Sequence, residues 1–162
     1  MIREGINRMP GPIEQYLQED HRSMDELRSA GQWWEFRGRL LRHLGLEEKM
    51  LFPEARRIRG GQPLPEVARL HEDHGLLATL LVPPPTPQIL EAIERLLAPH
   101  NLLEEGEGGV YAQCDALAGD RAAEIADRLR AAPATPQRAH QDGPLVQAQV
   151  QRALETLLTR SS

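Results

Sequence analysis

A histidine and a glutamate recur four residues apart at two places in the chain, at His43 and Glu47 and again at His100 and Glu104. Residues at positions i and i+4 of a helix lie one turn apart on the same face, so the two side chains of each pair can reach one point. Imidazole nitrogens and carboxylate oxygens are both ligands for transition metals. If both stretches are helical, the spacing therefore predicts a metal site.

Each pair belongs to a longer pattern that the chain repeats. A second glutamate, Glu48 or Glu105, directly follows each pair, and the sequence Glu-Asp-His precedes each pair, ending at His21 in the first copy and at His74 in the second. The interval from each of these histidines to its pair is long enough for the chain to leave one helix, turn and return on an antiparallel neighbour. A duplicated two-helix unit of this kind predicts a four-helix bundle whose ligands converge in the core and hold two metal ions.

Apolar residues recur at helical spacing in four stretches, which predicts the helices that would position these side chains. The expected helices cover residues 12–29, 33–58, 64–81 and 87–104. Pro99, inside the fourth helix, lacks a backbone donor and predicts a kink just before His100. The glycines at 106, 108 and 109 weaken a helix, so this wall of the site is either mobile or held by packing, and we expect packing to prevail.

The chain beyond this pattern predicts two further helices, over residues 120–131 and 145–158, joined by a linker that contains prolines. No residue of the repeated ligand pattern lies in this stretch. We therefore expect residues 1–118 to form the metal-binding bundle and residues 119–162 to form a C-terminal helical extension. The extension would act as a cap or as the surface of a homodimer.

The composition favours an all-α protein and argues against several classes of partner. Of the 162 residues, 40% are hydrophobic and 4% are aromatic, which suffices for the core of one domain. The formal net charge is −5, and the arginines are scattered among acidic residues, so we expect no nucleic-acid partner. Cys114 is the only cysteine, which fits a reducing compartment. The first residues lack an apolar signal segment, and no apolar run could span a membrane, so we expect a cytoplasmic protein with no membrane partner.

Four imidazoles and two carboxylates suit iron, zinc or manganese, and the sequence does not select among these metals. If Glu47 and Glu104 each bridge, every metal ion receives two histidine nitrogens and two carboxylate oxygens. A shared oxo or hydroxo bridge would supply a fifth ligand and leave one octahedral position open at each metal. An open position suits a diatomic ligand, whereas structural zinc sites are closed.

Six residues carry a resemblance to a known family: His21, His43, Glu47, His74, His100 and Glu104. In this order they resemble the ligand set of the hemerythrin-like, or HHE cation-binding, domain over about residues 10–118. The resemblance implies an up-down four-helix bundle with a non-haem di-iron centre that handles O2, with NO or peroxide as other ligands. It assigns one iron to the two histidines of the first copy and the other iron to those of the second copy, with both glutamates as bridges.

His71 is a seventh candidate ligand. Oxygen-carrying members of this family have His-x-x-x-His on the third helix, where this chain has His71 three residues before His74. Residues at i and i+3 lie about 60° apart around a helix, so both could face the interior. We expect His71 to coordinate; in the alternative it lies at the edge of the bundle or orients a ligand by a hydrogen bond. Tyr111 could also face the site, although we expect a packing role for it.

Two classes of function fit this pattern. The first is a non-enzymatic di-iron protein that binds or senses O2 or NO, or stores iron, and we prefer it. The second is a di-iron peroxidase or oxidase, or a donor of iron to damaged iron–sulfur clusters. Repair members of the family carry an N-terminal segment with a cysteine, and no cysteine precedes His21 in this sequence. A third interpretation is a helical bundle with a buried polar network and no metal, in which unpaired buried carboxylates would be costly.

Overall fold

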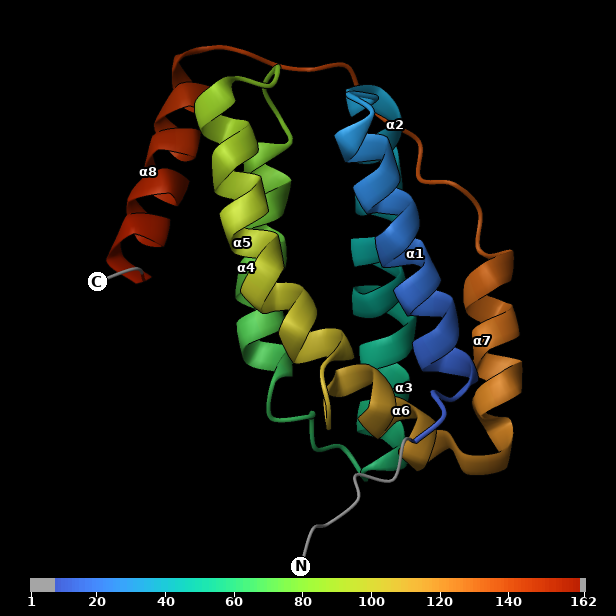
Figure 1. Cartoon of the computed structure of the whole chain (residues 1–162). Helices are drawn as coiled ribbons and strands as arrows, with labels where there is room; N and C mark the ends of the chain where they lie inside the picture. The colour runs from blue at the N-terminus through green and yellow to red at the C-terminus, as the bar shows by residue number, and fades with distance from the viewer. Residues whose placement is uncertain (1–7, 161–162) are drawn as a thin grey trace, which may run out of the picture.

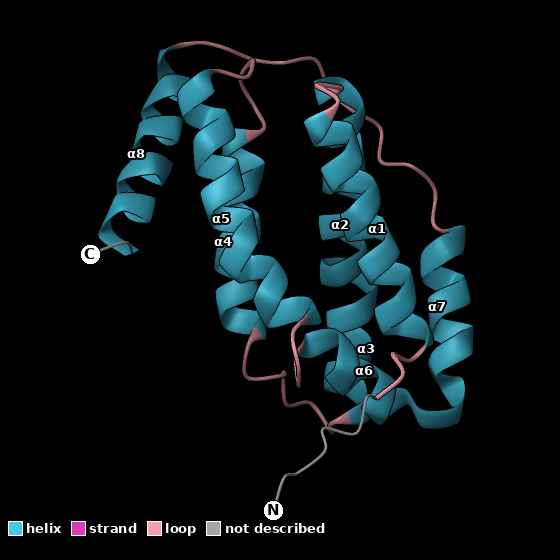
Figure 2. Ribbon diagram, viewed as in Figure 1, coloured by secondary structure: helices cyan, strands magenta, loops and turns pink. Residues whose placement is uncertain are grey.

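The structure, a computed structural model, describes residues 8–160. Within this range all the regular secondary structure is helical, as predicted, and there is no strand (Figure 2). The α-helices are α1 (Pro12–Ser29), α2 (Trp33–Leu46), α3 (Phe52–Ile58), α4 (Val67–Leu80), α5 (Pro87–Glu105), α6 (Val110–Ala118), α7 (Ala122–Ala131) and α8 (Pro144–Arg160). Residues 1–7, on which the expectation about a signal segment depended, lie outside the described residues.

The two copies of the sequence repeat form two neighbouring pairs of helices. α1 packs beside α2 in the first copy, and α4 packs beside α5 in the second copy (Figure 1). α5 also contacts α1, which brings the two pairs together. The faces that carry the repeated histidines and glutamates therefore meet in the interior.

The predicted helix over residues 33–58 is one helical run that contains a π-helical turn at Glu47–Leu51. The backbone N–H of Phe52 bonds to the carbonyl of Glu47, five residues earlier. Pro53 follows at once and has no N–H to donate, so a regular helical bond is impossible there. π-turns inside α-helices are frequent at functional sites, and this one begins at a candidate metal ligand.

The fourth predicted helix ends at Glu105, one residue beyond its predicted end, and it does not continue through the glycines. The expectation that packing holds this wall of the site stays a prediction. Gly108 has a φ of 67°, which favours glycine, and a Cβ on Gly109 would lie 2.7 Å from the carbonyl oxygen of Glu104. The chain turns here and begins α6 at Val110. Pro99 lies inside α5 as expected, and the kink there stays a prediction.

Two apolar clusters lie above and below the layer that holds the repeated histidines. Along α1, Leu17 belongs to one cluster and Met24 to the other, and His21 lies between them in the sequence. The helices of the extension add to both clusters, since Leu129 of α7 joins the first and Leu154 of α8 joins the second. The predicted domain division at residue 118 and the homodimer surface stay predictions.

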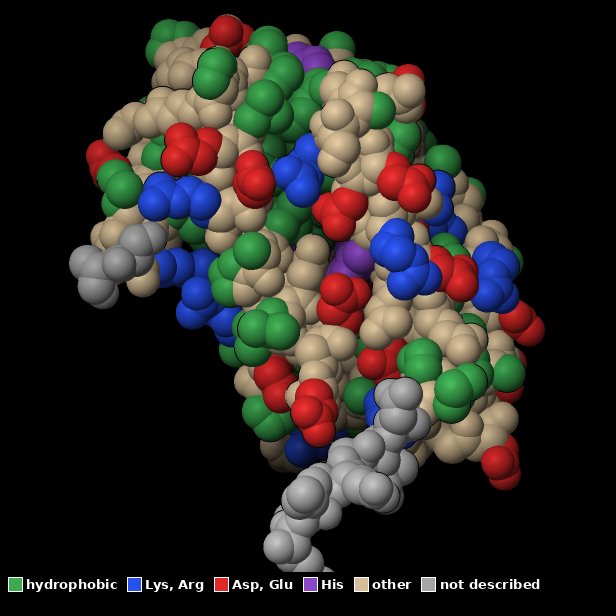
Figure 3. Space-filling view, in the orientation of Figure 1, with side chains coloured by type: hydrophobic (Ala, Val, Ile, Leu, Met, Phe, Trp, Pro, Cys, Tyr) green, Lys and Arg blue, Asp and Glu red, His purple; other side chains and the backbone are tan. Residues whose placement is uncertain are grey.

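The visible face of the molecule carries acidic and basic side chains that are intermixed with apolar ones (Figure 3). Among residues 8–160, no helix combines the length and the apolar character that crossing a membrane requires.

Candidate metal centre

Six of the seven predicted ligands come together between the two apolar clusters. None of them is more than 5% exposed. They are His21 of α1, His43 of α2, Glu47 of the π-turn, His74 of α4, and His100 and Glu104 of α5. Their potential ligand atoms form two groups, each with all atoms within 4.8 Å of one another, and Glu104 belongs to both. The prediction of a buried histidine–glutamate group that could hold a metal ion is confirmed.

Each glutamate lies between one histidine of the first copy and one of the second. Glu104 Oε1 is 3.4 Å from His21 Nε2 and 3.1 Å from His100 Nε2. Glu47 Oε1 is 3.4 Å from His43 Nε2 and 3.3 Å from the Nε2 of the fourth histidine, His74. All four imidazoles thus direct Nε2 toward the same interior space, and the carboxylates lie where they can be shared between the copies.

Several inward-facing atoms have no hydrogen-bond partner among the described residues. They are Glu47 Oε1, His74 Nε2, His100 Nε2 and both carboxylate oxygens of Glu104. A buried polar group left without a partner costs about 1–3 kcal/mol, and more if it is charged. A cation bound among these atoms would satisfy them together, and a mixed set of nitrogen and oxygen donors suits iron, zinc or manganese. The residues present therefore fit a metal ion.

Two aspartates hold the histidines that belong to the His-x-x-x-Glu pairs. Asp20 Oδ2 lies 2.8 Å from His43 Nδ1, and Asp73 Oδ2 lies 3.0 Å from His100 Nδ1. Burial alone would raise the pKa of Asp20, but its contacts with His43 and an arginine lower the pKa below its ordinary value. A charged aspartate at Nδ1 keeps a proton on that nitrogen, so in the neutral imidazole the Nε2 lone pair would be directed at the candidate metal position.

Two glutamates do the same for the other histidines, but across the copies. Glu48 of the first copy lies 2.7 Å from His74 Nδ1, and Glu105 of the second copy lies 3.0 Å from His21 Nδ1. Each of these glutamates directly follows a candidate ligand in the sequence. All four outer carboxylates belong to the sequence repeat, although their spacing alone predicts no role for them. Their repetition was the sequence feature that could have indicated a role at the site, because residues that only make a surface polar are not expected to recur together with the ligands.

Tyr111 contacts the cluster directly, although the sequence predicts mainly a packing role for it. Its hydroxyl donates a hydrogen bond to Glu47 Oε2 at 3.0 Å and lies 3.1 Å from Nε2 of both His21 and His43. Burial raises its pKa well above the ordinary value, and the nearby carboxylates add to this effect, so the phenol stays protonated. Tyr111 reaches the site because α6 begins after the glycine turn. Asp115 of α6 then accepts hydrogen bonds from the first backbone N–H groups of α1, which holds α6 in place.

His71 lies outside the cluster. Its side chain is 72% exposed, and its Nδ1 is 3.1 Å from Glu48 Oε1. This placement contradicts its predicted role as a metal ligand. It matches the alternative, a histidine at the edge of the bundle. Its partner Glu48 is also the carboxylate that holds His74.

The buried charges determine which protons the metal-free cluster carries. Burial and the neighbouring Glu104 raise the pKa of Glu47 well above its usual range. Burial would also raise the pKa of Glu104, but its contacts with Glu47 and His100 hold it well below that range. Burial lowers the pKa of His21, yet Glu104 and Glu105 outweigh this and raise it to about 10; Glu104 and Asp73 do the same for His100, also to about 10. A metal ion must therefore displace protons from this cluster.

In comparisons with known proteins, no protein-family model, no curated protein and no solved structure matches this chain. What the residues could bind is therefore argued from their own geometry. That geometry supplies a buried, duplicated set of nitrogen and oxygen donors, each imidazole backed by a carboxylate.

Proposed function

We propose that this chain is a hemerythrin-like protein that holds two non-haem iron ions and binds or senses O2, NO or a related small oxidant. The observation that carries the proposal is the position of Glu47 and Glu104. Each lies between one imidazole of the first copy and one imidazole of the second copy. Two metal ions need shared anionic ligands to remain close together, and these two carboxylates would be shared between them. The proposal includes the up-down four-helix arrangement that the family resemblance implies.

The two histidines of each copy would hold one ion. When bound, a pair of irons supplies the ability to coordinate a diatomic ligand and exchange electrons with it. The chain's own contribution is to orient the imidazoles through the four outer carboxylates and to exclude water with the two apolar clusters. Tyr111 keeps its proton and offers it as a hydrogen bond beside Glu47.

The space next to the cluster favours a very small ligand. A cavity of about 10 Å³ adjoins His21, His43, His100 and Glu104. Its other lining is mostly apolar, contributed by residues that include Met24. A cavity of this size holds about one water molecule, so a diatomic molecule fits better than an organic substrate.

A di-iron peroxidase is the second candidate, and Tyr111 favours it. A phenol that stays protonated in contact with Glu47 can act as a proton donor next to the metals. The cysteine offers no support for an iron–sulfur repair function, since Cys114 is buried and burial raises its pKa to about 12. A thiol of this kind is neither exposed nor ionised at neutral pH.

Metal analysis combined with spectroscopy tests the proposal. The protein, expressed with iron and purified in air, should contain about two irons per chain and show visible ligand-to-metal charge-transfer bands that change on adding NO or azide. Glu47→Ala should lower the content of both ions, whereas His43→Ala should mainly lower one, with helicity retained in both. Zinc alone or no metal would contradict the di-iron proposal, and full two-iron loading of Glu47→Ala would contradict the shared-ligand arrangement. Peroxide consumption that Tyr111→Phe abolishes would move the assignment to the peroxidase.

A further inference from the structure

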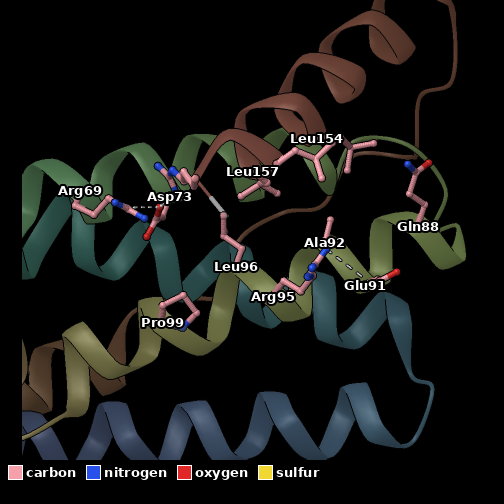
Figure 4. Close-up of a pocket in the computed structure, with 12 residues that line it drawn as sticks. Arg69, Asp73, Gln88, Glu91, Ala92, Arg95, Leu96, Pro99, Leu154 and Leu157 are labelled. Atoms are coloured by element: carbon pink, nitrogen blue, oxygen red, sulfur yellow. Dashed lines mark hydrogen bonds and ion pairs between the residues drawn. The ribbon is translucent and has the colours of Figure 1, made fainter. Parts of the chain in front are cut away.

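A cavity of about 400 Å³ lies between α4, α5 and α8 (Figure 4). Its volume is within the range of about 300–1,000 Å³ that is usual for small-molecule sites. None of the six clustered ligands lines it, although Asp73, the partner of His100, forms part of its wall. The cavity is therefore a separate site beside the candidate metal centre.

Apolar side chains form the middle of the cavity. Ala92 and Leu96 project from α5, and Leu154 and Leu157 project from α8 on the opposite side (Figure 4). Ala92, Leu96 and Leu154 are buried, so this part of the wall belongs to the packed core and is preformed, while Leu158 in the same lining is exposed and supplies apolar area that a ligand would cover. Such a surface favours an alkyl chain, because apolar area leaves water on both partners.

Charged side chains surround this apolar strip, with three arginines and two carboxylates among the lining residues. Asp73 engages two of the arginines, with Oδ1 at 3.3 Å from Arg69 and 2.5 Å from Arg160. Arg95 has a weaker partner, since its Nη1 lies 4.0 Å from Glu91 and both side chains are at least 65% exposed. An exposed pair at that distance contributes little, so the guanidinium of Arg95 can turn to a ligand.

We propose that this cavity binds an amphipathic monocarboxylate, with its alkyl chain along the leucines and its carboxylate on Arg95. The guanidinium group offers paired N–H donors that match the two oxygens of a carboxylate. Arg160 is already held by Asp73 and Glu72, which leaves Arg95 as the main partner of the head group. A phosphate monoester carries a charge of about −1.5 to −2, more than the single positive charge of Arg95, and Asp73 and Glu91 would repel it more strongly than a monocarboxylate.

Octanoate is a suitable probe, with octanol and octyl phosphate as comparators that carry the same alkyl chain. Titration into the metal-free 162-residue protein, followed by calorimetry and by NMR shifts of Leu96 and Leu154, gives three dissociation constants. This measurement does not depend on the metal centre, so its outcome is independent of the proposed function. We expect octanoate to bind about tenfold or more tightly than octanol, because only the carboxylate gains a charge-assisted hydrogen bond. Equal affinity for the two, or tighter binding of octyl phosphate, would overturn the proposal.

A charge reversal locates the head group. Arg95→Glu changes an exposed side chain and should leave the fold intact, while weakening octanoate binding about tenfold or more and leaving octanol binding unchanged. Arg22→Glu makes the same change at an exposed position on α1, away from the cavity, and should leave octanoate binding as in the unmodified protein. If Arg95→Glu binds octanoate as tightly as the Arg22→Glu control, the assignment of Arg95 fails.

Discussion

Arg160 Nη1 lies 2.5 Å from Asp73 Oδ1, and the other oxygen of Asp73 lies 3.0 Å from His100 Nδ1. The last helix of the chain is thereby connected to a candidate metal ligand. In the first copy of the repeat, Arg39 Nε lies 2.7 Å from Asp20, so the arginine comes from α2. In the second copy it comes from α8, so a helix of the C-terminal extension contacts the surroundings of the candidate metal centre.

Arg160→Gln should weaken the binding of the metal ion assigned to His74 and His100. The substitution removes a positive charge that holds Asp73 ionised and oriented, so His100 should be less well positioned. We expect the affinity for this ion to fall several-fold and at most about tenfold. A tenfold loss is the lower end of the range that is usual when the hydrogen-bond partner of a metal ligand is changed. Metal titration with a competing chelator measures this. Arg152→Gln, an exposed change on the same helix, is the matched control, and an equal loss in both variants would mean that α8 acts only by general packing.

His71→Gln should leave metal content, the visible spectrum and azide affinity unchanged, because His71 is exposed and its ring nitrogen contacts the outer carboxylate Glu48. Glu48→Gln is the variant to compare with it, because this substitution alters the carboxylate that lies 2.7 Å from His74 Nδ1. That variant should lose about tenfold or more in affinity for one ion. A changed spectrum in His71→Gln at full metal loading would restore His71 as a ligand.

Tyr111→Phe should destabilise the metal-free protein by about 1–3 kcal/mol, because Glu47 Oε2 loses its buried hydrogen-bond donor. Urea unfolding followed by circular dichroism measures the free energy. Tyr16→Phe removes another buried hydroxyl, one that accepts a hydrogen bond from Arg42 away from the site. In the metal-loaded protein, only Tyr111→Phe should change NO or azide affinity; equal affinities in both variants would show that the Tyr111 hydroxyl serves packing alone.

Metal binding should release protons and strengthen as pH rises. The pKa values of His21 and His100 are raised to about 10, so both imidazoles carry an extra proton at neutral pH in the metal-free protein. A metal ion must displace those protons, and the apparent affinity should therefore increase with pH from neutrality toward about 10. Calorimetry in buffers of different ionisation enthalpy counts the released protons. An enthalpy that does not depend on the buffer would show that the metal meets histidines that are already neutral.

The sequence by itself determined the six clustered residues and the helical class. The i, i+4 relation of His43 and Glu47 is local, so any helix over that stretch brings the two side chains to one point. The second copy repeats the relation at His100 and Glu104. A pattern that is both local and duplicated leaves little for tertiary packing to change.

Only the tertiary structure decided the positions of His71, Tyr111 and Arg160. The i, i+3 spacing of His71 and His74 gives their angle around α4, but the packing of α4 decides which of the two turns inward. Tyr111 depends on the direction that the chain takes after the glycines at 106–109, which a positive φ permits but does not specify. Arg160 meets Asp73 across 87 residues. Contacts this distant in sequence carry no periodic signal, because they arise only when separate helices bury their apolar faces against one another.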